Sequence, residues 1–294
     1  MAYIDEGPRD ATEILLLMHG EPSWSYLYRK MIPPLLAKGY RCIAPDLVGF
    51  GRSDKPVRDE DYTYERHLAW LKDVLFHHLN LCNVTAVFQD WGGLLGLRLA
   101  AAQPARFRRL VIANTFLPTC DDSFFKVPDG FYKWKRAAPK LMRESTTPIG
   151  IFMKSGGTAG PDGHISKEEQ DGYAAPFPSD EYKAGARRFP ELVPTPPSDP
   201  TGRPQSKEGE NNAAAWCVFK YWHKPTLLAF SDGDAVMQGA DQVWIKNCPG
   251  TQGQPHVTIK GCGHFLQDGG ASQLVDAITA FIDLNPKTLV GAKL

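Results

Sequence analysis

The chain has 294 residues, of which 43% are apolar, enough to bury a sizeable core and to exclude a disordered protein. Its 33 Lys and Arg residues balance its 33 Asp and Glu residues, and a net charge of zero argues against nucleic-acid binding. No apolar run reaches the roughly 18–20 residues that cross a bilayer, and the first residues carry no secretory signal. Six scattered cysteines without a C-x-x-C pair indicate reduced thiols, so we expect a cytoplasmic globular protein.

Short apolar runs that predict strands alternate with helical patterns. In chain order, strands are expected over residues 13–18, 40–44, 84–89, 110–113, 225–230 and 256–259. Helical patterns occupy residues 31–38, 65–79, 92–102 and 273–284. Short strands separated by helices predict βαβ units, and therefore a parallel sheet that is covered by helices on both faces.

Residues 119–221 break this alternation, because they are rich in Pro, Gly, aromatic and charged residues and show no clear strand pattern. Ser166-Lys-Glu-Glu169 reads as a capping box, and Ser179 is expected to cap a helix before residues 182–188. Residues 194–204 contain five prolines and predict an extended loop. The simplest interpretation is a helical cap over residues 119–221, inserted into an α/β core formed by residues 1–118 and 222–294.

Val87-Phe-Gln-Asp-Trp-Gly-Gly93 runs from a predicted strand into a glycine pair and a helix, which is the pattern of a nucleophile elbow. Asp90 stands where many hydrolases place serine, and a carboxylate can attack saturated carbon without first losing a proton. The alternative is an ordinary helix N-cap, for which Asp is a favoured residue. Phe88 departs from the pattern, since an elbow prefers a small residue at that position.

Met18-His-Gly-Glu-Pro-Ser-Trp24 follows the first clear strand as a tight turn. The backbone amide after the glycine, that of Glu21, can point into the site and help to form an oxyanion hole. A plain Gly/Pro turn is the alternative, and His19 itself is interpreted as structural.

Two late loops complete the order nucleophile, acid and base along the chain. Ser231-Asp-Gly-Asp234 follows one strand, and Gly261-Cys-Gly-His-Phe265 follows the next. His264 is the expected base, and Asp234 is favoured over Asp232 as its partner. No spacing of His, Cys, Asp or Glu residues suggests a metal site, and no dinucleotide or Walker pattern is present.

These residues resemble the α/β-hydrolase superfamily and, within it, the haloalkane dehalogenases. The likeness extends over His19-Gly-Glu-Pro-Ser-Trp-Ser-Tyr-Leu-Tyr-Arg29, Ala44-Pro-Asp-Leu-Val-Gly-Phe-Gly-Arg-Ser-Asp54, Gln89-Asp-Trp-Gly-Gly93, Tyr173-Ala-Ala-Pro-Phe-Pro178 and Gly263-His264. It implies an α/β-hydrolase fold with a mostly parallel central sheet, helices on both faces and an inserted helical cap. Glu21 follows His-Gly, and the cap contains a tryptophan, Trp134. In both features the sequence resembles the subfamily with two halide-binding tryptophans.

The resemblance implies hydrolytic dehalogenation of haloalkanes to a primary alcohol and halide, without a cofactor. Asp90 would be the nucleophile that forms an alkyl ester, His264 the base, and Asp234 the acid that orients it. The backbone amides of Glu21 and Trp91 would hold the oxyanion, and the Glu21 side chain would help to hold the hydrolytic water.

The halide would lie between the indole N–H groups of Trp91 and Trp134, which donate but cannot accept hydrogen bonds. Phe131 and Phe189 resemble residues of the pocket wall, with ordinary core packing as the alternative for each. For Trp134 the alternative is simple packing within the cap. The expected partners are a small apolar halogenated substrate and a halide ion, with no nucleic acid and no membrane, and the expected state is a monomer.

The front of the chain departs from the family, whose members carry an antiparallel strand pair before the segment that matches Tyr3-Ile-Asp-Glu-Gly-Pro8. We therefore expect a sheet without one edge strand and without part of the next.

Two other functions remain open. An epoxide hydrolase would use the same Asp nucleophile with two cap tyrosines, for which Tyr132 and Tyr173 are candidates. A non-catalytic hydrolase-fold binding protein would usually lack a catalytic residue. A fluoroacetate dehalogenase is disfavoured, because no Arg follows Asp90 to bind a carboxylate.

Overall fold

A computed structural model describes residues 1–121, 123–143, 149–150, 153, 165–196 and 207–287 of the chain. Its centre is a seven-stranded sheet with the strand order β1-β3-β2-β4-β5-β6-β7. The strands are β1 (Tyr3–Glu6), β2 (Ile14–Met18), β3 (Arg41–Pro45), β4 (Val84–Gln89), β5 (Phe107–Ala113), β6 (Thr226–Ser231) and β7 (Val257–Ile259). All neighbouring strands pair in parallel except β1, which runs antiparallel to β3 at the edge. The α/β-hydrolase fold class is thereby confirmed.

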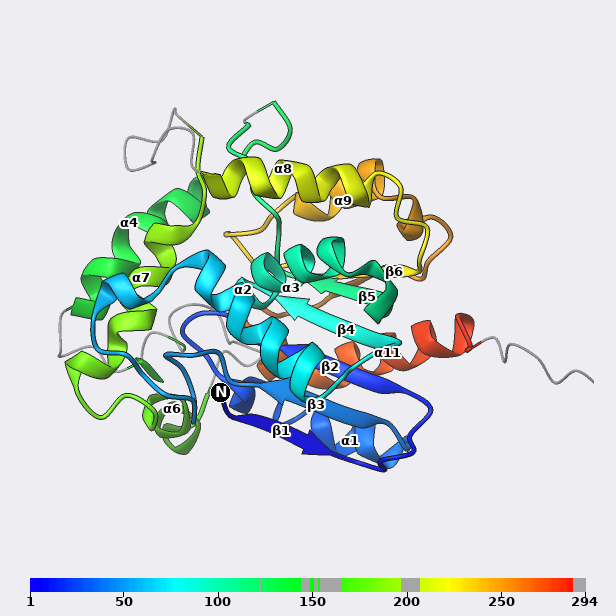
Figure 1. Cartoon of the computed structure of the whole chain (residues 1–294), viewed down its shortest axis with the longest axis horizontal. Helices are drawn as coiled ribbons and strands as arrows, with labels where there is room; N and C mark the ends of the chain where they lie inside the picture. The colour runs from blue at the N-terminus through cyan, green and yellow to red at the C-terminus, as the bar shows by residue number, and fades with distance from the viewer. Residues whose placement is uncertain (122, 144–148, 151–152, 154–164, 197–206, 288–294) are drawn as a thin grey trace, which may run out of the picture.

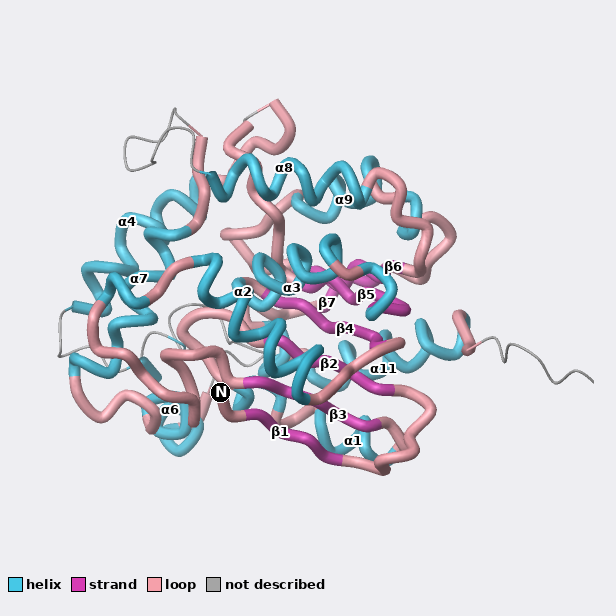
Figure 2. The backbone as a smooth tube through the Cα atoms, viewed as in Figure 1, coloured by secondary structure: helices cyan, strands magenta, loops and turns pink. Residues whose placement is uncertain are grey.

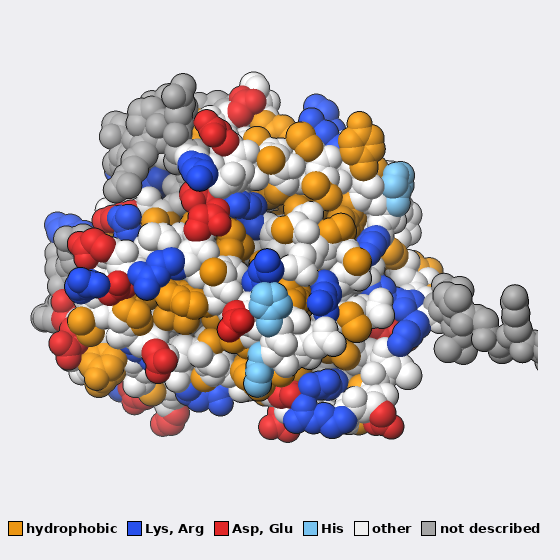
Figure 3. Space-filling model, in the orientation of Figure 1, with side chains coloured by type: hydrophobic (Ala, Val, Ile, Leu, Met, Phe, Trp, Pro, Cys, Tyr) orange, Lys and Arg blue, Asp and Glu red, His pale blue; other side chains and the backbone are white. Residues whose placement is uncertain are grey.

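Helices cover both faces of the sheet (Figures 1 and 2). Within the described ranges the α-helices are α1 (Ile32–Ala37), α2 (Tyr64–Lys72), α3 (Trp91–Ala102), α4 (Asp129–Arg143), α6 (Lys167–Ala174), α7 (Ala184–Leu192), α8 (Lys207–Phe219), α9 (Ala240–Asn247), α10 (Leu266–Gly269) and α11 (Ala271–Leu284). None of the helices in the described ranges is long and apolar enough to cross a membrane. On the face in Figure 3, acidic and basic side chains are interspersed over the described residues, in keeping with the zero net charge.

The predicted strands are all present, and β4 has the predicted bounds. Strand β5 begins before the apolar run that predicted it. The prediction started too late because a charged residue, Arg109, lies inside the strand, where it is fully buried and pairs with Glu13 at 2.8 Å. Strand β1 was not predicted, since Tyr3–Glu6 is too short and too polar at one end to give a periodic signal.

Two predictions about helix boundaries have different outcomes. The Ser166 capping box is confirmed, with Ser166 and Glu169 exchanging side chain to backbone hydrogen bonds at the start of α6. The Ser179 cap is wrong, because that hydroxyl makes no capping hydrogen bond and a 3-10 turn, Asp180–Lys183, comes before α7. Of the predicted proline-rich loop, residues 197–204 lie outside the described residues, and residues 194–196 are irregular as expected.

Helices α4, α6 and α7 lie together beyond the ends toward which the parallel strands point (Figure 1). Helix α8 also falls inside residues 119–221, yet it packs along α3 of the core. Arg98 of α3 contacts Glu208 and Asn212 of α8. The active-site candidates therefore lie between the strand ends and the group of α4, α6 and α7.

Candidate active site

Asp90 lies on a sharp turn between β4 and α3. Its backbone has φ 48° and ψ −127°, a conformation that L-residues adopt only when the surroundings impose it. The carboxylate makes no hydrogen bond that caps α3, so the N-cap interpretation does not hold. Two glycines make the turn possible, because a Cβ on Gly92 would lie 2.2 Å from the Met18 carbonyl oxygen and one on Gly93 would lie 2.1 Å from Thr115 Oγ1. The strand–turn–helix geometry is that of a nucleophile elbow.

The bulky Phe88 fits behind this elbow because α3 carries a glycine opposite it. A Cβ on Gly96 would lie 2.3 Å from Phe88 Cε1, so a larger residue at position 96 would displace the ring. Gly96 thus makes room for a bulky residue at position 88, where a nucleophile elbow usually has a small one.

The turn after β2 brings a backbone donor to the Asp90 carboxylate. The Glu21 N–H donates to Asp90 Oδ1 at 2.7 Å, and a Cβ on Gly20 would lie 2.1 Å from the same oxygen. The His19 side chain holds this turn with two hydrogen bonds. Its Nε2 accepts from the Leu47 N–H at 3.0 Å. The proton is therefore on Nδ1, which donates to the Gly20 carbonyl at 2.9 Å. His19 is therefore structural, as expected.

The Glu21 side chain is buried beside Asp90. Among the described residues neither of its carboxyl oxygens has a hydrogen-bond partner. Burial, and then the nearby charge of Asp90, raise the pKa of Glu21 well above its usual value. The neutral form is therefore favoured, and its O–H and carbonyl oxygen are free to bind a water molecule.

His264 lies between two carboxylates. Its Nε2 is 3.3 Å from Asp90 Oδ2, and its Nδ1 is 2.8 Å from Asp234 Oδ2. The other oxygen of Asp234 accepts from the backbone N–H groups of Val236 and Met237, at 2.8 and 3.3 Å. These contacts fix both the acid and the orientation of the imidazole, which is the arrangement of a nucleophile–base–acid triad.

Asp232, the other candidate for the acid, has different contacts. It is exposed, accepts from the Gly261 N–H at 2.9 Å and lies 3.8 Å from Lys260 Nζ. The geometry therefore favours Asp234, the residue that the loop position predicted.

The charge state of His264 follows from its neighbours. Burial alone would lower its pKa, but the Asp234 and Asp90 carboxylates outweigh burial and raise the pKa to about 10. The imidazole is thus protonated in the resting site at neutral pH. Loss of the Asp90 charge removes one of the two groups that raise the pKa, so it would favour the neutral, basic form.

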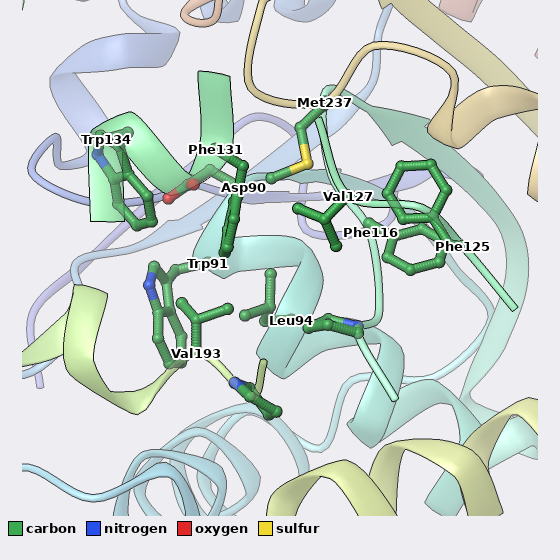
Figure 4. Close-up of a pocket in the computed structure, with 12 residues that line it drawn as sticks. Asp90, Trp91, Leu94, Phe116, Phe125, Val127, Phe131, Trp134, Val193 and Met237 are labelled. Atoms are coloured by element: carbon green, nitrogen blue, oxygen red, sulfur yellow. The ribbon is translucent and has the colours of Figure 1, made fainter. Parts of the chain in front are cut away.

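An apolar cavity opens above the elbow (Figure 4). Its lining residues are Asp90, Trp91, Leu94, Phe116, Pro118, Phe125, Val127, Phe131, Trp134, Val193, Pro194 and Met237. Only Asp90 among them carries a charge, and none is a Lys, Arg, Ser, Thr, Asn or Gln. Such a lining suits a neutral, apolar molecule with one reactive end near the carboxylate.

Of the residues predicted to bind halide or to form the pocket wall, three line this cavity and one does not. Trp91 begins α3 and Trp134 comes from α4, and both indoles line the cavity (Figure 4). The Trp91 N–H is buried, and no described residue accepts a hydrogen bond from it. Phe131 also lines the cavity, whereas Phe189 lies one layer behind, with its ring centroid 4.3 Å from that of Trp91.

Comparison with known proteins agrees with this geometry. A profile of the alpha/beta hydrolase fold matches residues 13–271. A haloalkane dehalogenase of Psychrobacter cryohalolentis is 48% identical over 97% of this chain and 88% of its own length. The chain belongs to the haloalkane dehalogenase family. Another member, from Mycolicibacterium paratuberculosis, is 45% identical over 96% of this chain and 87% of its own length.

A solved structure of the same family has the same fold. The tetrameric haloalkane dehalogenase DpaA from Paraglaciecola agarilytica superposes with a TM-score of 0.79 at 32% identity, covering 98% of this chain and 88% of its own.

In this member of the haloalkane dehalogenase family, three polar side chains that the sequence did not predict hold the loop of His264. Asn114 Nδ2 donates to the carbonyl oxygens of Gly263 and His264 at 3.1 and 3.0 Å. Gln89 Nε2 donates to the His264 carbonyl at 3.2 Å, and Ser231 Oγ donates to that of Gly263 at 2.7 Å. All three stand at the carboxyl ends of strands β4, β5 and β6, a position that places them near the site but does not by itself give their role.

The two cap tyrosines that an epoxide hydrolase would need do not line the cavity. Tyr173 is fully buried, and its hydroxyl donates to Asp268 at 2.7 Å and accepts from Arg29 at 3.1 Å. Tyr132 packs its ring against Phe131.

Proposed function

We propose that this enzyme hydrolyses haloalkanes to a primary alcohol and a halide ion through an alkyl ester on Asp90. The observation that carries the proposal is the Asp90 carboxylate itself, which lies on an elbow at the floor of an apolar cavity. One of its oxygens accepts from the Glu21 N–H, and the other faces His264. The relatives named above are called haloalkane dehalogenases, which supports the same substrate class.

The first step is displacement at carbon. Asp90 Oδ1 is held by the Glu21 amide, so Oδ2 is the oxygen left to attack the halogen-bearing carbon. The new C–O bond forms as the carbon–halogen bond breaks, and the halide leaves with the bonding electrons. We place the halide against the indole N–H groups of Trp91 and Trp134, since the Trp91 donor is buried without a protein acceptor among the described residues.

The second step is hydrolysis of the ester. Alkylation removes the charge of Asp90, which lowers the pKa of His264, so that the imidazolium releases its Nε2 proton to solvent. The neutral Nε2 then accepts a proton from water. The resulting hydroxide attacks the ester carbonyl, and the tetrahedral oxyanion is stabilised by the Glu21 amide and, we propose, by that of Trp91. Collapse breaks the ester bond, and the alcohol takes its proton from the hydroxyl group that was added, so the Asp90 carboxylate is restored. His264 keeps the proton taken from water and returns to its resting form; overall one water is consumed and one proton is released with the halide.

The alternatives are weaker. An epoxide hydrolase needs tyrosine hydroxyls directed at the substrate, and neither Tyr132 nor Tyr173 lines the cavity. A non-catalytic binding protein would not need His264 held between Asp90 and Asp234.

Halide release from a panel of 1-chloro-, 1-bromo- and 1-iodoalkanes tests the proposal. We expect one halide and one alcohol per substrate from the unmodified enzyme, and no halide from Asp90→Ala. Absence of halide release over the whole panel, together with hydrolysis of simple epoxides, would support the epoxide hydrolase reading instead.

Three further predictions stay with the proposal. The enzyme is expected to need no added cofactor, to be cytoplasmic and to be a monomer. The relative DpaA is described as tetrameric, so light scattering on the purified enzyme decides the oligomeric state.

A further inference from the structure

A cluster of charged and polar side chains joins the cap to the core away from the cavity. We call it the cap–core ion cluster; its members are Arg29, Lys30, Glu169, Tyr173 and Asp268. Two cations face two carboxylates, so the cluster is neutral in total. It connects three segments: the end of the turn region that follows Glu21, helix α10, and helix α6 of the cap.

Asp268 is the centre of the cluster and is 3% exposed. Its carboxylate accepts from Arg29 Nη2 at 2.9 and 3.1 Å, from Lys30 Nζ at 2.6 Å and from the Tyr173 hydroxyl at 2.7 Å. Burial raises the pKa of Tyr173 well above its usual value, so its hydroxyl is a donor throughout the working pH range. Glu169 contacts the same two cations, at 2.6 Å from Arg29 and 2.8 Å from Lys30.

Close packing holds α6 against the core at this point. The Arg29 guanidinium lies 4.2 Å from the centre of the Tyr26 ring, which in turn meets the Tyr173 ring edge-on at 5.1 Å. Trp24 Nε1 donates to the Gly172 carbonyl at 3.2 Å, and a Cβ on Gly172 would lie 2.7 Å from the Tyr26 ring. Tyr173 belongs to α6, so a movement of this helix relative to the core would move the Tyr173 hydroxyl relative to Asp268.

Asp268 lies four residues after His264, on α10, which begins two residues after the imidazole. On its upstream side the His264 loop is fixed to strand ends by Asn114, Gln89 and Ser231. On its downstream side the charged anchor of α10 is Asp268, whose backbone N–H also donates to the Phe265 carbonyl. One side of the base is thus held by the sheet, and the other is held by a group that the cap itself contacts.

We propose that Asp268 and Tyr173 are positioning residues that couple cap helix α6 to His264, and that the Tyr173 hydroxyl holds the base at the correct distance from the ester in the second chemical step. This inference rests on the proposed function, in which His264 activates water. The first step depends on Asp90 and the cavity, which Tyr173 does not line, so the coupling acts on hydrolysis and not on alkylation.

The test is Tyr173→Phe, which removes one hydroxyl and keeps the ring, compared with Tyr182→Phe, a cap tyrosine that is 38% exposed. Rapid-quench measurements on a bromoalkane give the alkylation and hydrolysis rate constants separately. In Tyr173→Phe we expect hydrolysis to slow about tenfold while alkylation stays within about twofold, because small misplacements of a base cost one to two orders of magnitude. Mass spectrometry should then show alkylated Asp90 accumulating in the steady state, and KM should fall with kcat.

Other outcomes overturn the inference. Equal slowing of both steps would show a general loosening of the cap, and a ratio of rate constants equal to that of Tyr182→Phe would show that the hydroxyl has no positioning role. Either result leaves the proposed function intact, because the unmodified enzyme still releases halide. If the unmodified enzyme releases no halide, both the proposed function and this inference are overturned. If Tyr173→Phe does not fold, Lys30→Met removes another donor to Asp268 from a more exposed position, and the same selective slowing of hydrolysis is expected.

Discussion

Replacing His264 with glutamine separates the two chemical steps and is the most direct test of the proposed mechanism. The glutamine amide can still donate toward Asp90 Oδ2, which lies 3.3 Å from the native imidazole, but it cannot accept a proton from water. Alkylation should therefore proceed within a few-fold of the normal rate, because displacement at carbon needs no base. Hydrolysis of the ester should almost stop.

The size of the second effect follows from what the site retains. The Glu21 amide remains 2.7 Å from Asp90 Oδ1, so stabilisation of the oxyanion is preserved and only proton transfer is lost. General-base catalysis contributes about 10²–10⁴-fold, which corresponds to about 3–5 kcal/mol in the barrier. Steady-state turnover should fall by that factor, while the first turnover releases about one halide per active site.

Rapid-quench halide detection measures this burst, and mass spectrometry of the digested protein locates the alkyl group. We expect the label on the peptide that contains Asp90. Continued turnover of His264→Gln near the normal rate would refute the role of His264, and a label on another residue would refute the mechanism as a whole.

The pH dependence of the same two steps gives an independent check. The pKa of His264 is raised to about 10 while Asp90 is charged, and it falls once the ester has formed. Below that lower pKa the imidazolium cannot accept a proton, so the hydrolysis rate of the unmodified enzyme should rise with pH and level off below about 10. His264→Gln should lack this rise, and a pH-independent hydrolysis rate in the unmodified enzyme would contradict the argument.

Other substitutions test the remaining parts of the site. Trp134→Phe removes one donor to the halide and should weaken halide binding by about 1–3 kcal/mol, measured by tryptophan fluorescence; unchanged binding would refute the assignment. Asp234→Asn should slow hydrolysis by about 10³–10⁴-fold in single-turnover assays, whereas Asp232→Asn should stay within about twofold, and the reverse result would exchange the two acids. Gly96→Ala should destabilise the fold by about 1–3 kcal/mol in urea unfolding, because the added methyl needs space held by Phe88; Phe88→Leu in that background should recover part of the loss.

Much of this site was predictable because its residues stand where a parallel sheet exposes reactive groups. Asp90 follows β4 and precedes Trp91 and two glycines, whereas Asp234 follows β6 and His264 follows β7, in the order that an α/β-hydrolase requires. These signals are local in sequence, and the topology then brings the three side chains together.

The features that the sequence did not predict depend on contacts between segments that are far apart in the chain. The start of β5 was missed because Arg109 is a charged residue whose partner, Glu13, lies on another segment of the chain. Asn114 and Gln89 look like ordinary loop and strand-end residues until their hydrogen bonds to the His264 carbonyl are seen. The placement of Phe189 behind Trp91, and not on the cavity wall, also depends on how the cap sits on the core.

The halide site that we propose at the Trp91 indole N–H would make the surrounding salt part of the folding equilibrium. A buried donor without an acceptor destabilises the native state by about 1–3 kcal/mol, and no described residue satisfies this one. An anion at the proposed halide site would bind the folded chain and not the unfolded one, so we expect the apparent melting temperature to rise with the anion's concentration. Chloride in an ordinary buffer would then act as a stabilising ligand and as a competitor of substrate at the same time. Two preparations of one sequence that differ only in their counterion would melt at different temperatures.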